Sequence, residues 1–139
     1  MRKIRCSVLS EEGSNLIEMA LAAILLLLLL GGVVDIGRMF SSYIIITNAS
    51  REAARYASHF PADENGIKQA AIAEAADSGV EILQGDIDID GLGAASGNPI
   101  RVYITHDYPI VTAGVIGYSE VALTSSTEMI IFGLDPPAN

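Results

Sequence analysis

The sequence predicts an α+β fold: a long N-terminal transmembrane helix, from about residue 14 to residue 58, continues into a small exported domain with one short helix and an antiparallel sheet of three or four strands. Three observations predict it. Residues 19–34 are uncharged and almost wholly aliphatic, and residues 35–58 contain no proline and a single glycine, Gly37. From residue 80 onward, β-branched residues alternate with polar ones, as strands require.

The apolar run is long enough to cross a membrane. With Leu16 and Ile17 included, it spans about 28 Å as a helix, close to a hydrocarbon core of about 30 Å. Its six consecutive leucines, residues 25–30, favour insertion by roughly 2 to 4 kcal/mol, so the carboxylate of Glu18 near the helix end is tolerated. A cleaved signal peptide is the alternative, but VVDIGR after the run lacks an A-x-A-like cleavage site.

The basic residues Arg2, Lys3 and Arg5 precede the apolar run. By the positive-inside rule, we expect a single-pass protein of the inner (cytoplasmic) membrane, with its N-terminus in the cytoplasm. Everything after about Asp35 is then periplasmic or extracellular. The lipid bilayer is therefore an expected partner.

The charge of the chain excludes one class of partner. The formal net charge is -9, and from Gly66 onward only Lys68 and Arg101 are basic, against ten acidic residues. An acidic surface repels phosphate, so we expect no nucleic acid.

The helix is expected to continue past the membrane. Apolar side chains recur at spacings of three and four, and two opposite-charge pairs, Asp35 with Arg38 and Glu52 with Arg55, lie three residues apart, where they can meet on a helix surface. The residues of the apolar pattern are Ile36, Phe40, Tyr43, Ile44, Thr47 and Ala54.

The remaining segments predict the exported domain. SHFPADENG ends the long helix, and IKQAAIAEAA predicts a short helix ending near Gly79. Strands are expected in VEILQGDIDIDG, PIRVYITHDYPI and SEVALTSSTEMIIF, with GLGAASGNP as a flexible connection and IVTAGVIG as an apolar crossover. The tail LDPPAN is expected to fray.

The N-terminal segments resemble a known family. Gly13 followed by SNLIEM resembles the processing site of class III, type IV-like prepilins, which a membrane aspartic peptidase cuts after the glycine. LLLLLLGGVVDIGRMF and NASREAARYAS are similar to the TadE-like pseudopilins of the tight adherence (Tad/Flp) pilus system. The resemblance covers residues 13–58. Met19 stands where major Flp pilins carry tyrosine, and Ser50 and Ala53 stand where the family often has alanine and glycine.

The resemblance implies three regions: a prepilin-type leader (1–13), a transmembrane and extended amphipathic helix (14–58) and an exported α+β domain (59–139). It implies a minor pseudopilin or pilus assembly protein of a Tad-type secretion system, cut between Gly13 and Ser14. Its implied partners are the prepilin peptidase, other pilins and pseudopilins, and the inner-membrane pilus assembly platform. The helix motif comprises Asp35, Gly37, Arg38, Asn48, Arg51, Glu52 and Arg55.

Glu18 has two interpretations. In the family role, its carboxylate pairs with the new α-amino group of Ser14 on a neighbouring subunit, because an unpaired charge is costly in a low dielectric. In the simpler one, it is an interfacial carboxylate favoured by the N-terminal helix dipole. For the whole protein, the alternative to a pseudopilin is a signal-anchored envelope protein whose small exported domain binds a ligand.

No catalytic or cofactor site is expected. DIDIDG resembles the start of an EF-hand calcium loop through Asp86, Asp88 and Asp90, but its twelfth position is Gly97, not a bidentate glutamate. The isoleucines between these aspartates favour a strand. His59, His106 and the single cysteine, Cys6, lie at no metal-ligand or catalytic spacing, so we expect a non-enzymatic protein without cofactors.

Overall fold

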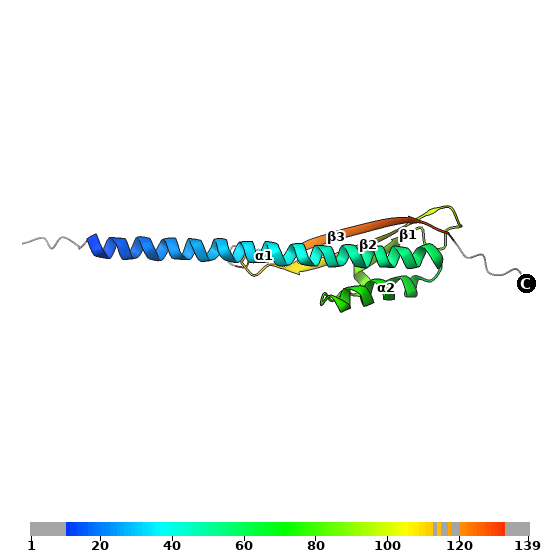
Figure 1. The fold of residues 1–139 in the computed structure, drawn as a ribbon, viewed down its shortest axis with the longest axis horizontal. Coiled ribbons are helices and arrows are strands. Elements are labelled where there is room, and N and C mark those ends of the chain that lie inside the picture. Colours follow the sequence, from blue (N-terminus) through cyan, green and yellow to red (C-terminus); the bar gives the residue numbers. More distant parts are fainter. Residues whose placement is uncertain (1–10, 113, 115–116, 118–119, 133–139) are drawn as a thin grey trace, which may run out of the picture.

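The computed structural model describes residues 11–112, 114, 117 and 120–132. Along the chain follow the helices α1 (Glu11–His59) and α2 (Glu64–Asp77), the 3-10 turn η1 (Gln84–Asp86), and the strands β1 (Ile87–Asp90), β2 (Pro99–Pro109) and β3 (Glu120–Ile130). Figure 1 shows α1 as one long rod whose second half carries the sheet and α2. The predicted α+β fold with a long N-terminal helix is confirmed.

The three strands form one antiparallel sheet in the order β1-β2-β3. β3 pairs with β2 along its full length, from Pro99 opposite Ile130 to Pro109 opposite Glu120. β1 covers only the first part of β2, where Ile87 lies opposite Ile104. Because β2 and β3 are neighbours, the segment expected as an apolar crossover joins adjacent strands instead.

The first strand is shorter than the sequence predicted. The Leu83 amide donates to the Asp86 carboxylate at 2.9 Å, and the Asp86 amide donates to the Leu83 carbonyl at 3.0 Å. These two bonds close the turn η1, so pairing with β2 begins only at Ile87. The strand predicted from Val80 was therefore wrong over its first seven residues.

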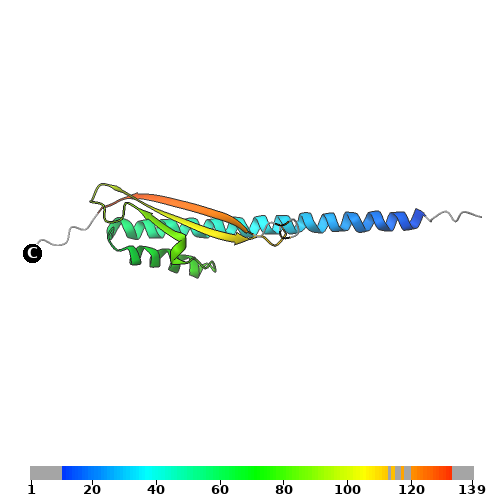
Figure 2. The same ribbon diagram turned by 180° about the vertical axis from the view of Figure 1, so that it is seen from behind.

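The core lies between the second half of α1, α2 and the sheet (Figure 2). The two helices meet through alanines, whose small side chains let the backbones approach closely, and the sheet adds branched aliphatic side chains. The fully buried core residues of the helices are Ile46, Ala49, Ala53, Ala54, Ala57, Ile67, Ala71 and Ala75, and those of β2 are Ile100, Val102 and Ile104.

The first half of α1 is free of this core. All side chains described from residue 13 to residue 30 are exposed. Among the described residues, α1 is the one helix long and apolar enough to cross a membrane, and 0% of its most apolar stretch is buried. The chain therefore carries a helix that fits a single-pass membrane anchor.

Both helices begin three residues earlier than predicted: α1 starts at Glu11 and α2 at Glu64. The start of α2 has a clear cause, since the Asp63 side chain accepts a hydrogen bond from the Gly66 amide and caps the helix. The basic residues before the helix, Cys6, and the tail predicted to fray lie outside the described residues.

Candidate assembly interface

The residues of the predicted cleavage and assembly site lie in the first two turns of α1. Gly13, Ser14 and Glu18 are all helical and exposed. Ser14 and Glu18 are four residues apart and therefore lie on the same side of the helix. Glu18 takes part in none of the ion pairs formed among the described residues. Its carboxylate is thus presented outward at one end of the apolar segment.

An exposed apolar stripe continues along α1 beyond the predicted membrane span. We call Ile36, Phe40, Tyr43 and Ile44 the outer stripe; Phe40 has 64% of its surface exposed, and the other three are also exposed. Other residues of α1 face the core: Met39 and Ile45 are partly buried, and full burial begins at Ile46. The helical spacing predicted from the sequence is present, but its first four members face away from the core.

Asp35 does not pair with Arg38 as the sequence predicted. Its carboxylate accepts hydrogen bonds from the backbone amide of Thr112 at 2.7 Å and from the Thr112 hydroxyl at 2.5 Å. Asp35 is only 6% exposed, whereas Arg38 is exposed and forms no ion pair among the described residues. The strand connection after β2 supplies both donors, so the nearer cation is left in solvent.

The same connection packs against Gly31. A Cβ atom at this position would clash with Cγ2 of Thr112. A Cβ atom at Gly37, by contrast, would meet nothing within 4 Å, so packing does not require a glycine there. Gly31 and Asp35, one turn apart, therefore hold Thr112 against α1.

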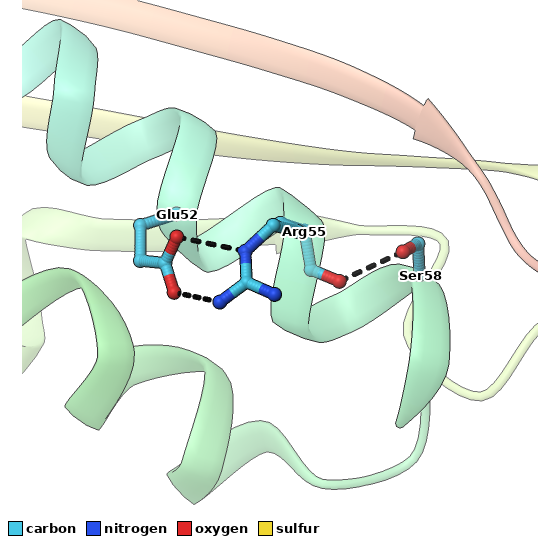
Figure 3. Close-up of polar contacts among 3 residues, drawn as sticks. All are labelled: Glu52, Arg55 and Ser58. Atoms are coloured by element: carbon cyan, nitrogen blue, oxygen red, sulfur yellow. Dashed lines mark hydrogen bonds and ion pairs between the residues drawn. The ribbon is translucent and has the colours of Figure 1, made fainter.

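The second predicted ion pair forms. Nε of Arg55 donates to Glu52 at 2.9 Å, and the same guanidinium makes a second, shorter contact with this carboxylate; Figure 3 shows both. The hydrogen bond from Arg55 lowers the pKa of Glu52, and the same bond raises the pKa of Arg55. The Ser58 hydroxyl donates to the Arg55 carbonyl at 2.7 Å (Figure 3). Arg55 is exposed, so this pair contributes little to stability.

The other polar residues of the helix motif face outward. Asn48 and Arg51 are exposed, and Arg51 forms no ion pair among the described residues. Arg51 and Arg55 follow at i and i+4, which places two guanidinium groups on one side of the helix. This side of α1 is available for a partner.

A cluster of hydroxyl groups joins α1 to β3, and the sequence analysis did not predict it. The buried hydroxyl of Ser50 lies 2.8 Å from Oγ1 of Thr127 and 3.3 Å from Oγ of Ser125, and it donates to the Thr47 carbonyl at 2.9 Å. The Ser125 hydroxyl also reaches Oγ1 of Thr47 at 3.3 Å. Ser50 is therefore a polar contact between helix and sheet.

The three aspartates of DIDIDG are not gathered. Asp86 caps η1, while Asp88 and Asp90 are exposed and alternate with Ile87 and Ile89 along β1. Within the part of the chain that the structure describes, no group of three His, Cys, Asp or Glu side chains could hold a metal ion. The isoleucine alternation predicted for a strand is present.

Comparison with known proteins gives one family. A family model described as TadE-like protein matches residues 13–55, about a third of the chain. No curated protein and no solved structure matches the chain significantly. The match begins at Gly13 and ends at Arg55. It covers the exposed first part of α1 and most of the part that packs in the core. Residues 13–55 of α1 are therefore similar to the TadE-like family, as the resemblance indicated.

Proposed function

We propose that the protein is a minor pseudopilin, or pilus assembly protein, of a Tad-type secretion system. The observation that carries the proposal is the surface of α1 within the TadE-like segment. Its apolar side chains are exposed through the membrane span and again along the outer stripe. Lipid would cover the exposed apolar side chains of the membrane span. The outer stripe would need a protein partner, and neighbouring subunits that pack through their helices would supply it.

Processing after Gly13 would give Glu18 its partner. A cut between Gly13 and Ser14 creates a cationic α-amino group at the new end of α1. In lipid or in the interior of a fibre, this amine and a carboxylate stabilise each other, because each is costly alone in a low dielectric. The exposed Glu18 would pair with the amine of a neighbouring subunit and set the register between the two helices.

The proposal places the protein in the inner membrane, with the folded domain on the periplasmic or extracellular side. Its partners there are the prepilin peptidase, other pilins and pseudopilins, and the membrane assembly platform. The proposal assigns the chain no catalysis of its own. The outer stripe and the arginines at positions 51 and 55 are the surfaces offered to neighbouring subunits.

Intact mass after co-expression with a prepilin peptidase tests the proposal. The protein extracted from the membrane should lose the mass of residues 1–13 and retain Ser14 as its N-terminal residue. Gly13→Val should block the loss, because a peptidase that requires glycine before the cut cannot accept a branched side chain. Gly37→Val is the matched control: it changes a helical glycine with open space around it and should be processed normally.

If the unaltered chain keeps its full mass while a known prepilin is cut under the same conditions, the pseudopilin proposal fails. The protein would then be an uncleaved signal-anchored envelope protein, with its function in the exported domain.

A further inference from the structure

We propose that the start of the β2–β3 connection, residues 110–112, inserts into the surface of the bilayer beside α1. The inference rests on the membrane anchor of the proposed function and adds a second contact between the protein and lipid. The folded domain would then sit directly on the membrane, held by the anchor and by this connection.

The level of Thr112 along α1 is the first argument. Thr112 packs on Gly31 and bonds to Asp35, and Gly31 precedes the end of the apolar run at Val34 by three residues, about 4.5 Å along a helix. A run that fills the hydrocarbon core up to Val34 therefore places Thr112 at or just below the membrane surface.

A position of α1 further out of the membrane, with Thr112 in water, fits the bilayer less well. Lifting Thr112 into water would also lift residues 31–34, leaving residues 16–30 as the apolar span. Fifteen helical residues cover only about 22 Å, against a hydrocarbon thickness of about 30 Å. The shift would also draw Glu18 deeper into lipid. The position with Thr112 at the surface leaves neither mismatch.

The chemistry of the connection suits lipid. Val111 has 69% of its surface exposed, and Ile110 is half-buried beside it. The amide and the hydroxyl of Thr112 both donate to Asp35, so these polar groups are satisfied before the connection leaves water. The Asp35 carboxylate is covered by the same contact. The Val111 side chain is exposed, whereas Ile110 packs partly against the core and the polar groups of Thr112 face Asp35.

A small hollow beside the connection extends the apolar surface. It has a volume of about 170 Å³, lies between α1 and the start of the β2–β3 connection, and is lined by Gly32, Asp35, Ile36, Met39, Ile110 and Thr112. Four of these six residues present apolar side chains or no side chain. Because the hollow borders the apolar run of α1 at Gly32, we expect lipid to occupy it.

Site-directed spin labelling tests the inference. Single cysteines at Leu27, Val111 and Ser126 are introduced into the full chain with Cys6→Ser, since Cys6 is the only native cysteine. All three positions are exposed, so the labels should leave the core unchanged. The proteins are reconstituted into vesicles of phosphatidylethanolamine and phosphatidylglycerol. Collision with oxygen, which is enriched in lipid, is compared with collision with a water-soluble nickel complex.

The label at Leu27 should be reached by oxygen and shielded from nickel, and that at Ser126 should be open to nickel. The inference expects Val111 to be several-fold less accessible to nickel than Ser126. Equal nickel access at Val111 and Ser126, with Leu27 still in lipid, overturns the insertion and leaves the anchor intact. Nickel access at Leu27 overturns the anchor itself and the insertion with it.

Discussion

Ser50 shows how one polar side chain can specify the docking of a helix on a sheet. The surrounding interface of α1 is made of alanines, which pack closely but do not fix which strand residue lies opposite. The Ser50 hydroxyl meets hydroxyls of β3 that are 75 and 77 positions away in sequence. A buried hydroxyl is favourable only where its partners are present, so it penalises a shifted register.

Replacing Ser50 by alanine should lower the free energy of unfolding by about 1 to 2 kcal/mol, because Thr127 and Ser125 lose a partner in a buried interface. The measurement is urea unfolding of the full chain in detergent micelles, followed by circular dichroism. Ser126→Ala, at an exposed position of β3, is the matched control and should change stability by less than about 0.5 kcal/mol. Equal stability of the two variants would remove the role given to the cluster.

Sequence reasoning identified short-range contacts and missed long-range ones. The Glu52–Arg55 pair follows from a spacing of three on a helix, and it forms. The partner of Asp35 was sought at the same spacing, yet Thr112 lies 77 positions away. The amide and the hydroxyl of Thr112 both donate to the same carboxylate oxygen of Asp35. The exposed Arg38 does not replace these two hydrogen bonds. No pattern in the sequence links these positions.

Helix α2 begins directly after its N-cap residue, Asp63. Asp63 accepts hydrogen bonds from the Gly66 amide at 3.0 Å and from the Tyr56 hydroxyl at 2.9 Å. The Gly66 bond, with a contribution from Tyr56, lowers the pKa of Asp63, and hydrogen bonding to Asp63 raises the pKa of Tyr56. A Cβ at Gly66 would lie 2.5 Å from the Tyr56 hydroxyl oxygen. The cap therefore also joins α2 to the last turns of α1.

This cap should make stability depend on pH. Because the folded pKa of Asp63 lies below its unfolded value, the cap stabilises the protein at pH above the ordinary aspartate value of about 4. The stabilisation is lost as the pH falls through the lowered pKa. Asp63→Asn keeps an acceptor oxygen but does not titrate. Its stability should therefore fall less than that of the unaltered protein between about pH 5 and about pH 3.

Chemical unfolding of both proteins in detergent over this pH range measures the effect. Tyr56→Phe removes one of the two donors to Asp63 and should give an intermediate slope. Parallel curves for the three proteins would show that the cap does not contribute to acid sensitivity.

The helices and strands that the sequence predicted best are those with a long, regular residue pattern. The 49 residues of α1 contain no proline, and the 11 residues of β2 alternate between buried and exposed over most of their length. The segment from Val80 to Asp86 has the composition of a strand, but a local turn closed by Asp86 replaces pairing with β2. Aspartate three residues after a backbone donor is the signal that could have predicted this turn. Likewise, Asp63 before ENG is a helix-start signal.

The two halves of α1 have different surroundings. Its residues 13–30 are exposed, and its second half supplies a large part of the core. The folded domain therefore cannot be cut from the helix at residue 58 without removing the core face. The sequence predicted the helix and the sheet separately. The apolar pattern predicted for α1 began with Ile36, Phe40, Tyr43 and Ile44, which are exposed, whereas the face that packs in the core is mostly alanine.

Two substitutions on the outward side of α1 should disrupt assembly without disrupting the fold. Glu18→Ala removes the proposed partner of the processed N-terminus, and Phe40→Glu places a charge on the outer stripe. Both residues are exposed, so circular dichroism of the purified variants should match that of the unaltered protein. Co-purification with other pilins of the system from membranes carrying the full assembly machinery should be lost in both.

Glu81→Ala is the matched control, because it removes an exposed carboxylate outside α1 and should leave co-purification unchanged. Normal co-purification by Glu18→Ala would reduce Glu18 to an interfacial carboxylate. Normal co-purification by Phe40→Glu would exclude the outer stripe as a subunit contact.

The unbroken course of α1 has a mechanical consequence. A helix of 49 residues is about 73 Å long, and the core is bound along its far half, so the domain and the anchor turn together. A change in tilt of about 10°, within the range that membrane helices adopt, moves the far end of the rod by about 13 Å. A small change in the tilt of the anchor would thus be amplified at the opposite end of α1.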